Sequence, residues 1–431
     1  MLAATMPPAL TPRRIERTYL VLMLGNTLAT SFIWGINTIF LLDAGLSSTA
    51  AFTANALFTA GMVLFEVPTG IVADSVGRRA SYLLGTVTLS ASTLLYVLLW
   101  QIKAPFWAWA VVSILLGLGF TFFSGAVEAW LVDALAATGF TGSLETVFGR
   151  GQIVGGTAML AGSVAGGFIA EQTSLGVPFL LRGAVLLVMF AVAFALMHDV
   201  GFTPDRRSPP LAEMRRIAAA SIDYGWRVPA VKWLMLEALF TGGVGIYAFY
   251  ALQPYLLELY GDPHAYQIAG LVAAVVAGAQ ILGGIAAPRI RRLFHRRTSA
   301  LIATAALGTA ILMLIGSLES FAAVLGLIVV WGLLFAATMP IRQTYINGLI
   351  PSRQRATILS FDSLMTSSGG VWAQPALGRA ADAWGYASSY LLGAGISVLA
   401  IPCLVMSRRQ NAAADTVAVG EAAPEPVVEH A

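Results

Sequence analysis

Residues Leu57 to Ser90 read LFTAGMVLFEVPTGIVADSVGRRASYLLGTVTLS, two apolar runs joined by a short charged turn. A helix needs roughly 20 mostly apolar residues to cross a bilayer, and each run reaches that length when its apolar flank is included. The turn carries Asp74, Gly77, Arg78 and Arg79. A polar turn between two such runs predicts a pair of membrane-spanning helices that meets water at the turn.

The same pattern extends along the whole chain of 431 residues. Hydrophobic side chains make up 58% of it and charged side chains 11%, whereas soluble domains carry about a quarter charged residues. The chain is therefore predicted to be an all-α integral membrane protein with twelve transmembrane helices. Hydropathy and helix breakers place the spans at 18–42, 50–73, 80–101, 106–135, 149–171, 178–198, 233–258, 266–288, 298–317, 321–349, 357–382 and 387–407.

These spans predict two six-helix bundles with polar segments around them. The first run continues past signal-peptide length without a small-residue cleavage site, so we interpret it as a retained helix. Cys403 is the sole cysteine, which excludes a disulfide framework. The expected order is a tail at 1–17, bundles at 18–198 and 233–407, a central loop at 199–232 and a disordered tail at 408–431.

The basic residues indicate the orientation. If both termini are cytoplasmic, all but four of the 25 Lys and Arg residues lie on the cytoplasmic side. Lys103 and Arg379 are then outside, and Arg182 and Arg342 fall within spans. The positive-inside rule thus predicts cytoplasmic termini, and the net charge of +3 needs no nucleic-acid partner.

Matching residues recur at a constant offset of 214 in the two halves. The pairs are Gly70 and Gly284, Glu128 and Arg342, Asp133 and Asn347, and Gly155-Gly156 and Gly369-Gly370. This offset predicts two parallel six-helix repeats about an axis along the membrane normal. Such an arrangement places the substrate site between the halves near the middle of the bilayer.

The turn itself, GIVADSVGRR at Gly70–Arg79, resembles the loop signature G-x-x-x-D-x-x-G-R-K/R of the major facilitator superfamily of secondary transporters. The resemblance implies a cytoplasmic gate built from Gly70, Asp74, Gly77, Arg78 and Arg79. In that gate Gly70 would let a neighbouring helix approach, Gly77 would form a tight turn and Asp74 would face a helix N-terminus.

Three more stretches resemble bacterial exporters of this superfamily: EVPTG (Glu66–Gly70), SGAVEAWLVD (Ser124–Asp133) and INGLIPSRQRATILS (Ile346–Ser360). This resemblance implies a location in a bacterial inner membrane. The segment Gly162–Gly167 approximates the G-P-x-x-G-G portion of the antiporter motif, with Ser163 in place of proline. Small residues also drive ordinary helix packing in bilayers, so this segment is either an antiport marker or a packing surface.

Charged residues within spans are costly, so they are candidates for function. Glu66 and Glu128 are the proton-coupling candidates, because two carboxylates on neighbouring helices can bind protons near neutral pH; the alternative for Glu66 is a buried structural carboxylate. Glu128 and Arg342 could form a salt bridge between the halves when the cytoplasmic side closes. The alternative pairs Glu128 or Asp133 with Arg150, and Asp133, Arg150 and Arg342 complete the candidate gate.

The remaining charged and polar residues suggest other roles. Arg182 is expected to extend to the outer surface, and Glu237 is expected to be solvated at the membrane interface. Aromatic and uncharged polar groups suit a large and mostly apolar ligand, with core packing as the alternative. The substrate-cavity candidates are Trp34, Asn37, Tyr247, Tyr250 and Gln253.

Other functional classes are disfavoured. Neither lysine, Lys103 or Lys232, follows a glycine as a phosphate-binding loop requires, and the four histidines do not cluster as zinc ligands would. We therefore expect no enzyme activity, no cofactor and no metal. The leading hypothesis is a monomeric, proton-coupled exporter of small amphiphilic or cationic compounds; an importer, a uniporter or a transporter-like solute receptor are the alternatives.

Overall fold

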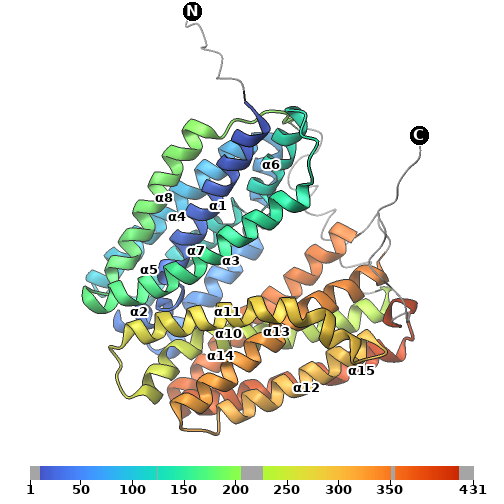
Figure 1. Ribbon diagram of the computed structural model, residues 1–431. Helices are drawn as coiled ribbons and strands as arrows, with labels where there is room; N and C mark the ends of the chain where they lie inside the picture. The colour runs from blue at the N-terminus through green and yellow to red at the C-terminus, as the bar shows by residue number, and fades with distance from the viewer. Residues whose placement is uncertain (1–9, 124, 205–226, 351–354, 417–431) are drawn as a thin grey trace, which may run out of the picture.

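The computed structural model describes residues 10–123, 125–204, 227–350 and 355–416, and its long elements are α-helices (Figure 1). The N-terminal half contains α1 (Pro12–Trp34), α2 (Asn37–Asp43), α3 (Ser48–Ser75), α4 (Arg78–Gln101), α5 (Phe106–Thr121), α6 (Ala126–Ala137), α7 (Leu144–Gln172) and α8 (Gly176–Leu196). The C-terminal half contains α10 (Pro229–Tyr260), α11 (Tyr266–Arg292), α12 (Arg297–Ile315), α13 (Phe321–Leu349), α14 (Arg355–Val398) and α15 (Ala400–Arg409).

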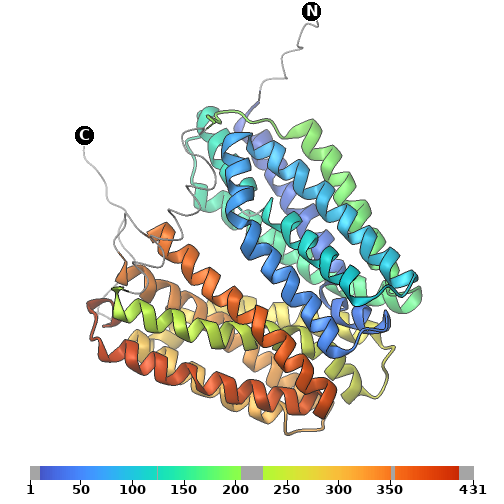
Figure 2. The same cartoon turned by 180° about the vertical axis from the view of Figure 1, so that it is seen from behind.

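The number of spans agrees with the prediction. Within the described residues, ten helical segments are long and apolar enough to cross a membrane, and the bent pair α1–α2 makes an eleventh. The last segment, Phe361–Arg409, is 49 residues long, about twice what a bilayer requires. It has non-helical backbone at Gly385, where the chain turns back (Figure 2). Counting its two arms separately gives twelve spans, which confirms the predicted fold class.

The two halves form separate bundles that meet at one end and diverge toward the end where α1 begins and α15 ends (Figures 1 and 2). The bundles contact each other through α3 with α14, α7 with α11, and α2 with α10. We call the meeting end, with loops 43–48, 172–176 and 260–266, the closed end. The opposite end, with loops 75–78 and 292–297, is the open end.

The apolar cores follow the same division. At the closed end one buried cluster joins Phe40 of the N-terminal half to Leu257 and Ala269 of the other half, and a second joins Phe52 to the core of the C-terminal half. At the open end each bundle has a core of its own. Apolar burial therefore holds the halves together at one end and leaves them independent at the other.

Two predicted spans are broken helices. The first bends by 47° between α1 and α2, where a Cβ atom on Gly35 would lie 2.9 Å from the carbonyl oxygen of Ala269 in α11. The fourth is divided into α5 and α6, and Gly125 adopts a left-handed φ of +68° immediately before α6. Hydropathy predicted both as single runs because a break within an apolar stretch leaves mean hydropathy unchanged.

The expected disorder of the C-terminal tail is wrong for its first residues. Ala413–Asp415 form a short 3-10 helix that packs on the start of α12. The Asp415 carboxylate is 1% exposed and accepts hydrogen bonds from the backbone N–H and hydroxyl of Thr298, both at 2.8 Å. Because α12 has no side-chain cap from its own N-cap residue, Asp415 takes that role from the tail. The rest of the tail, 417–431, lies outside the described residues.

Replacing Asp415 with alanine should therefore release the tail from α12. Loss of a helix cap costs about 0.5–2 kcal/mol, so the free energy of unfolding should fall by that amount. The measurements are thermal unfolding in detergent and limited proteolysis of the tail. Asp415→Asn keeps one acceptor oxygen and should fall between parent and D415A; a D415A protein with unchanged unfolding and cleavage would contradict the capping role.

Candidate functional site

Polar groups join the two halves at the closed end. Asp382 of α14 accepts hydrogen bonds from the backbone N–H groups of Ser48 and Thr49, both at 2.8 Å, and from the Thr49 hydroxyl at 2.6 Å. These N–H groups begin α3, so a carboxylate of one half sits at the positive end of a helix of the other. Glu171 of α7 likewise accepts from the backbone N–H of Gln267 in α11, at 2.9 Å.

Two of the predicted cavity residues belong to this interface. Gln253 is 2% exposed, donates to the carbonyl oxygen of Trp34 and accepts from the backbone N–H of Thr38, both at 2.9 Å. The Tyr247 ring packs on Phe52 with centroids 4.7 Å apart, and its hydroxyl lies 2.6 Å from Ser389 Oγ. Gln253 and Tyr247 thus hold helices together in this conformation, as the packing alternative states.

The antiporter-like segment of α7 also packs between helices. A Cβ atom on Gly166 would lie 1.9 Å from the carbonyl oxygen of Phe32 in α1. A Cβ atom on Gly167 would lie 2.5 Å from the carbonyl oxygen of Tyr266 and 2.8 Å from Cα of Gly270 in α11. The small residues therefore let α7 approach α1 within its own half and α11 across the interface.

The other three predicted cavity residues share one cavity of about 200 Å³, here called the central cavity. Trp34, Asn37 and Tyr250 line it, and Tyr250 comes from α10 of the other half. The wall is otherwise aromatic, aliphatic or uncharged polar, with one charged side chain, Arg182. The remaining lining residues are Thr30, Ile33, Asn55, Phe58, Met62, Thr93, Tyr96, Leu116, Phe120 and Phe179.

The prediction that Arg182 extends to the outer surface is wrong. The residue is 6% exposed and lies between the central cavity and a second cavity of about 250 Å³ in the N-terminal half, here called the N-half cavity. Both cavities are also lined by Thr30 and Phe120. The position of Arg182, one turn inside the end of its helix, did not reveal this burial, because it depends on the helices that pack around α8.

The two proton-coupling candidates lie apart. Glu128 is half-buried, lines the N-half cavity and stands in the first turn of α6, where the helix dipole favours a carboxylate. Glu66 is an exposed residue of α3 and lines neither cavity. The buried alternative for Glu66 is therefore wrong, and the structure does not bring Glu66, Glu128 and Arg342 together.

The loop between α3 and α4 forms a charged cluster at the open end of the N-terminal half. Gly77 has a φ of +132°, as the predicted tight turn requires. Arg78 pairs with Asp74 and lies 3.9 Å from Asp133. All of these contacts are within one half, and Gly70 has open space beside it. Of the predicted gate, the residues of the loop signature and Asp133 therefore gather at this loop, and no described helix of the other half contacts them.

Asp199, which the sequence did not single out, supplies the cap expected of Asp74. Its carboxylate accepts from the backbone N–H of Arg79 at 2.9 Å, at the start of α4, and a Cβ atom on Gly77 would collide with it. Burial raises the pKa of the Asp199 carboxyl, and hydrogen bonding and charge from Arg79 oppose that shift. A single acidic residue after a helix belongs to no motif or repeat, so the sequence did not indicate that Asp199 caps α4.

The alternative pairing of Arg150 with Glu128 or Asp133 is wrong. Arg150 of α7 forms an ion pair with Glu16 of α1. This contact joins two helices of the N-terminal half at the open end. Among the described residues, the predicted Glu128–Arg342 salt bridge is not formed while this end is open, and it remains a prediction for the closed state.

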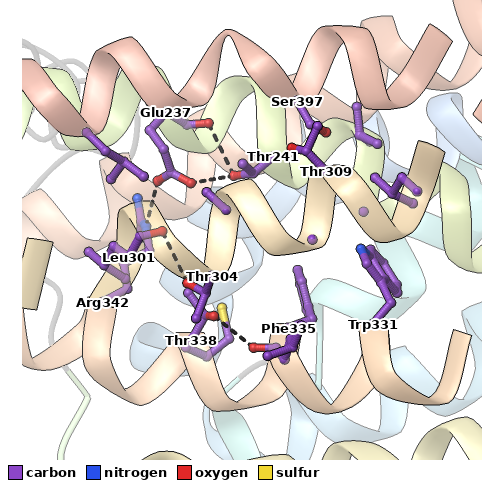
Figure 3. A pocket seen from close by; sticks show the side chains of 18 residues that line it. Glu237, Thr241, Leu301, Thr304, Thr309, Trp331, Phe335, Thr338, Arg342 and Ser397 are labelled. Carbon is purple, nitrogen blue, oxygen red and sulfur yellow. Dashed lines mark hydrogen bonds and ion pairs between the residues drawn. The ribbon is translucent and has the colours of Figure 1, made fainter. Parts of the chain in front are cut away.

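Arg342 instead belongs to a buried ion cluster of the C-terminal half, of which Figure 3 shows the contact with Glu237. Its guanidinium donates to both oxygens of Asp362, at 2.5 and 2.6 Å, to Glu237 at 3.2 Å and to the Leu234 carbonyl oxygen at 3.1 Å. Glu237 also accepts from the Thr241 hydroxyl at 2.7 Å. We call Glu237, Arg342 and Asp362 the buried triad.

The buried triad corrects one prediction and adds a residue. Glu237 is 7% exposed and paired, so its expected solvation at the interface is wrong. Asp362 is 5% exposed and was missed, although an acid within the predicted span 357–382 could have marked it. With both carboxylates ionised the triad carries one net negative charge, which a single bound proton neutralises. A cavity of about 110 Å³ adjoins it, lined also by Thr304, Trp331 and Thr338 (Figure 3).

The arrangement is that of known membrane transporters. The chain resembles the nucleoside transporter NupG (TM-score 0.74, 11% identity, covering 92% of this chain and 99% of that chain). It resembles a bacterial homologue of the human lysosomal transporter Spinster (0.70, 15%, 94% and 98%) and a D-xylose–proton symporter (0.63, 16%, 91% and 96%). At these identities the likeness concerns the fold.

Sequence comparison gives the family. No protein of curated function matches the chain. The family model described as Major Facilitator Superfamily matches residues 19–374, which covers the predicted loop signature and most of both bundles. The chain therefore belongs to the major facilitator superfamily and is a multi-pass membrane transporter, not an enzyme.

Proposed function

We propose that this transporter is a proton-coupled exporter of small amphiphilic organic compounds, acting as a monomer by alternating access in a bacterial inner membrane. The central cavity carries the proposal, because it lies in the N-terminal half against Tyr250 of the other half and is walled by aromatic rings and amides. Such walls suit a ligand with an apolar body and a few polar groups.

The charge distribution supports cytoplasmic termini. Basic residues concentrate at the open end, in the loops that contain Arg78, Arg79, Arg292 and Arg296, and by the positive-inside rule this end faces the cytoplasm. The conformation is then open to the inside and closed to the outside. Alternating access requires a second conformation in which the contacts of the closed end break and the open end closes around loop 75–78.

The cavity wall narrows the substrate class. Its described lining residues include no acidic side chain that could pair with a cation, and the one charged group is Arg182. The sequence-based expectation of cationic compounds therefore receives no support from the wall. The expectation of amphiphilic compounds is supported by the aromatic rings of Trp34 and Tyr250 and the amide of Asn37.

Glu128 is the proton carrier that we propose, because it lines a cavity that shares Arg182 with the central cavity. A carboxylate next to the substrate site can exchange a proton when the solute leaves. Glu66 remains the second candidate from the sequence. Glu237 and Asp362 of the buried triad are further carboxylates within the spans, and binding of one proton removes the net charge of the triad.

Replacing Glu128 with glutamine should abolish coupling while leaving the fold intact, because the amide keeps the shape and cannot release a proton. The measurement is solute-triggered proton movement in proteoliposomes with a pH-sensitive dye and an imposed gradient, screening organic acids, lipophilic cations and sugars. Glu145→Gln, an exposed acid at the start of α7, is the matched control and should behave as the parent. Coupling in E128Q equal to that of the parent would remove the proposed role.

The same assay separates the alternatives. Solute flux without a proton signal would indicate a uniporter. Uptake driven by inward proton flow would indicate an importer. The importer is worth testing because a D-xylose–proton symporter and the nucleoside transporter NupG are among the similar structures. Solute binding without flux would indicate a receptor. Proton-driven movement outward supports the exporter.

A further inference from the structure

Arg182 is a buried cation without a counterion in the part of the chain that the structure describes. It is 6% exposed, its Nε is buried without a hydrogen-bond partner, and no described carboxylate lies within ion-pair distance of it. Arg342 is nearly as buried, at 9% exposed, and bonds to two carboxylates and a carbonyl oxygen. The buried arginine of the C-terminal half is therefore paired with carboxylates, whereas the buried arginine of the N-terminal half is not.

The surroundings of Arg182 do not neutralise it. On the side of the central cavity, the ionisable side chains that line the wall with Arg182 are Tyr96 and Tyr250, whose hydroxyls are neutral. The Tyr96 hydroxyl is already bonded to Ser113 Oγ, at 2.6 Å. Glu128 faces the N-half cavity on the other side but forms no ion pair with Arg182 in this conformation. The guanidinium thus remains a positive charge at the wall of the central cavity.

An arrangement of this kind is energetically costly. Guanidinium stays protonated in proteins, so Arg182 cannot escape the cost by losing its charge. An unpaired ion in a low-dielectric interior is strongly unfavourable, and such residues in membrane spans typically face a substrate or ion path. The planar guanidinium matches carboxylate oxygens in a two-bond geometry. A bound carboxylate would therefore pair with the guanidinium and offset the cost of burying its charge.

We propose that Arg182 binds the carboxylate of the transported solute, so that the substrates are small organic acids with an apolar or aromatic body. The body would lie against Trp34, Phe58 and Tyr250, and the Asn37 and Asn55 amides would contact its remaining polar groups. This inference rests on the proposed function, since it assigns a substrate class to the same cavity.

The experiment compares three probes of one shape that differ in charge. Benzoate, benzamide and benzylamine are titrated into the purified full chain in detergent, with thermal unfolding and tryptophan fluorescence as readouts, and a set of aliphatic monocarboxylates is tested against the corresponding amides. We expect carboxylates to bind the parent more tightly than their amides and amines. Arg182→Met should weaken carboxylate binding by roughly tenfold or more and leave amide binding unchanged. Arg379→Gln, an exposed arginine of α14, is the matched control and should bind as the parent.

Stability provides a second readout that a structural role would not reproduce. Removing an unpaired buried cation should leave the unfolding temperature of R182M without ligand unchanged or higher, whereas removing a structural arginine lowers it. The proposal is overturned if no carboxylate binds more tightly than its amide, if R182M binds carboxylates as the parent does, or if R182M without ligand is less stable. If the parent binds carboxylates, R182M does not, and liposomes show no flux, the anion-binding role of Arg182 stands and the transport function is rejected. If neutral amphiphiles are transported equally by the parent and R182M, the transport function stands and this inference is overturned.

Discussion

Arg342→Met is expected to lower the free energy of unfolding by about 3–5 kcal/mol, the largest stability loss that we predict for this chain. The substitution leaves the Glu237 and Asp362 carboxylates buried, at 7% and 5% exposed, without the guanidinium that bonds to both. The measurement is unfolding in mixed detergent micelles against increasing SDS.

The control for this prediction removes all three charges of the buried triad. In the variant R342M/E237M/D362L no unpaired ion remains, and replacing buried ion pairs by hydrophobic residues of similar volume is often neutral or stabilising. We therefore expect the triple variant to unfold close to the parent. If R342M alone unfolds like the parent, or if the triple variant loses more than R342M, the buried triad is not an electrostatically coupled unit.

Gly167→Val is expected to open the closed end and reduce transport by roughly tenfold or more, which corresponds to about 1.4 kcal/mol in a conformational equilibrium. The Cβ atom alone would lie 2.5 Å from the carbonyl oxygen of Tyr266 and 2.8 Å from Cα of Gly270. Those are backbone atoms of α11, so the clash is relieved by moving the two halves apart. The measurement is labelling of Asn37→Cys in a Cys403→Ser background by a membrane-impermeant maleimide added outside, which should increase.

The same substitution in open space is the control. Gly326→Val on α13 has no atom within 4 Å of its Cβ position and costs a similar amount of helix propensity. It should label and transport as the parent. Asp382→Ala removes the three hydrogen bonds to the start of α3 and should increase labelling in the same direction as G167V. Unchanged labelling in both G167V and D382A would show that these contacts do not hold the outer side closed.

Much of the fold follows from local sequence. The run 321–349 is mostly apolar, with Arg342 as its one charged residue, and the predicted span coincides with α13. It forms a helix because every backbone hydrogen bond in a bilayer must be made within the segment. The turn at Gly77 was equally predictable, since only glycine adopts its φ of +132° without strain. The two helix breaks were not predictable from the sequence. A tertiary contact at Gly35 accompanies the bend between α1 and α2, and the left-handed backbone of Gly125 precedes α6.

The site was less predictable than the fold. The sequence correctly identified Trp34, Asn37 and Tyr250 as cavity residues. It also predicted Tyr247 and Gln253 as cavity residues, but these two join helices. Aromatic and amide side chains line cavities and also join helices, and only the position of the partner helix separates these roles.

The sequence by itself determined that this chain is a membrane protein of twelve spans in two similar halves, and that its basic residues gather at one end. These properties depend on hydropathy and on the bilayer, which act on each segment separately. The tertiary structure alone decided which charges are paired: Arg342 with Glu237 and Asp362, Arg150 with Glu16, and Arg182 with no described carboxylate. Pairing over a few ångströms depends on how helices from distant parts of the chain are rotated and packed, and residue spacing carries no record of that.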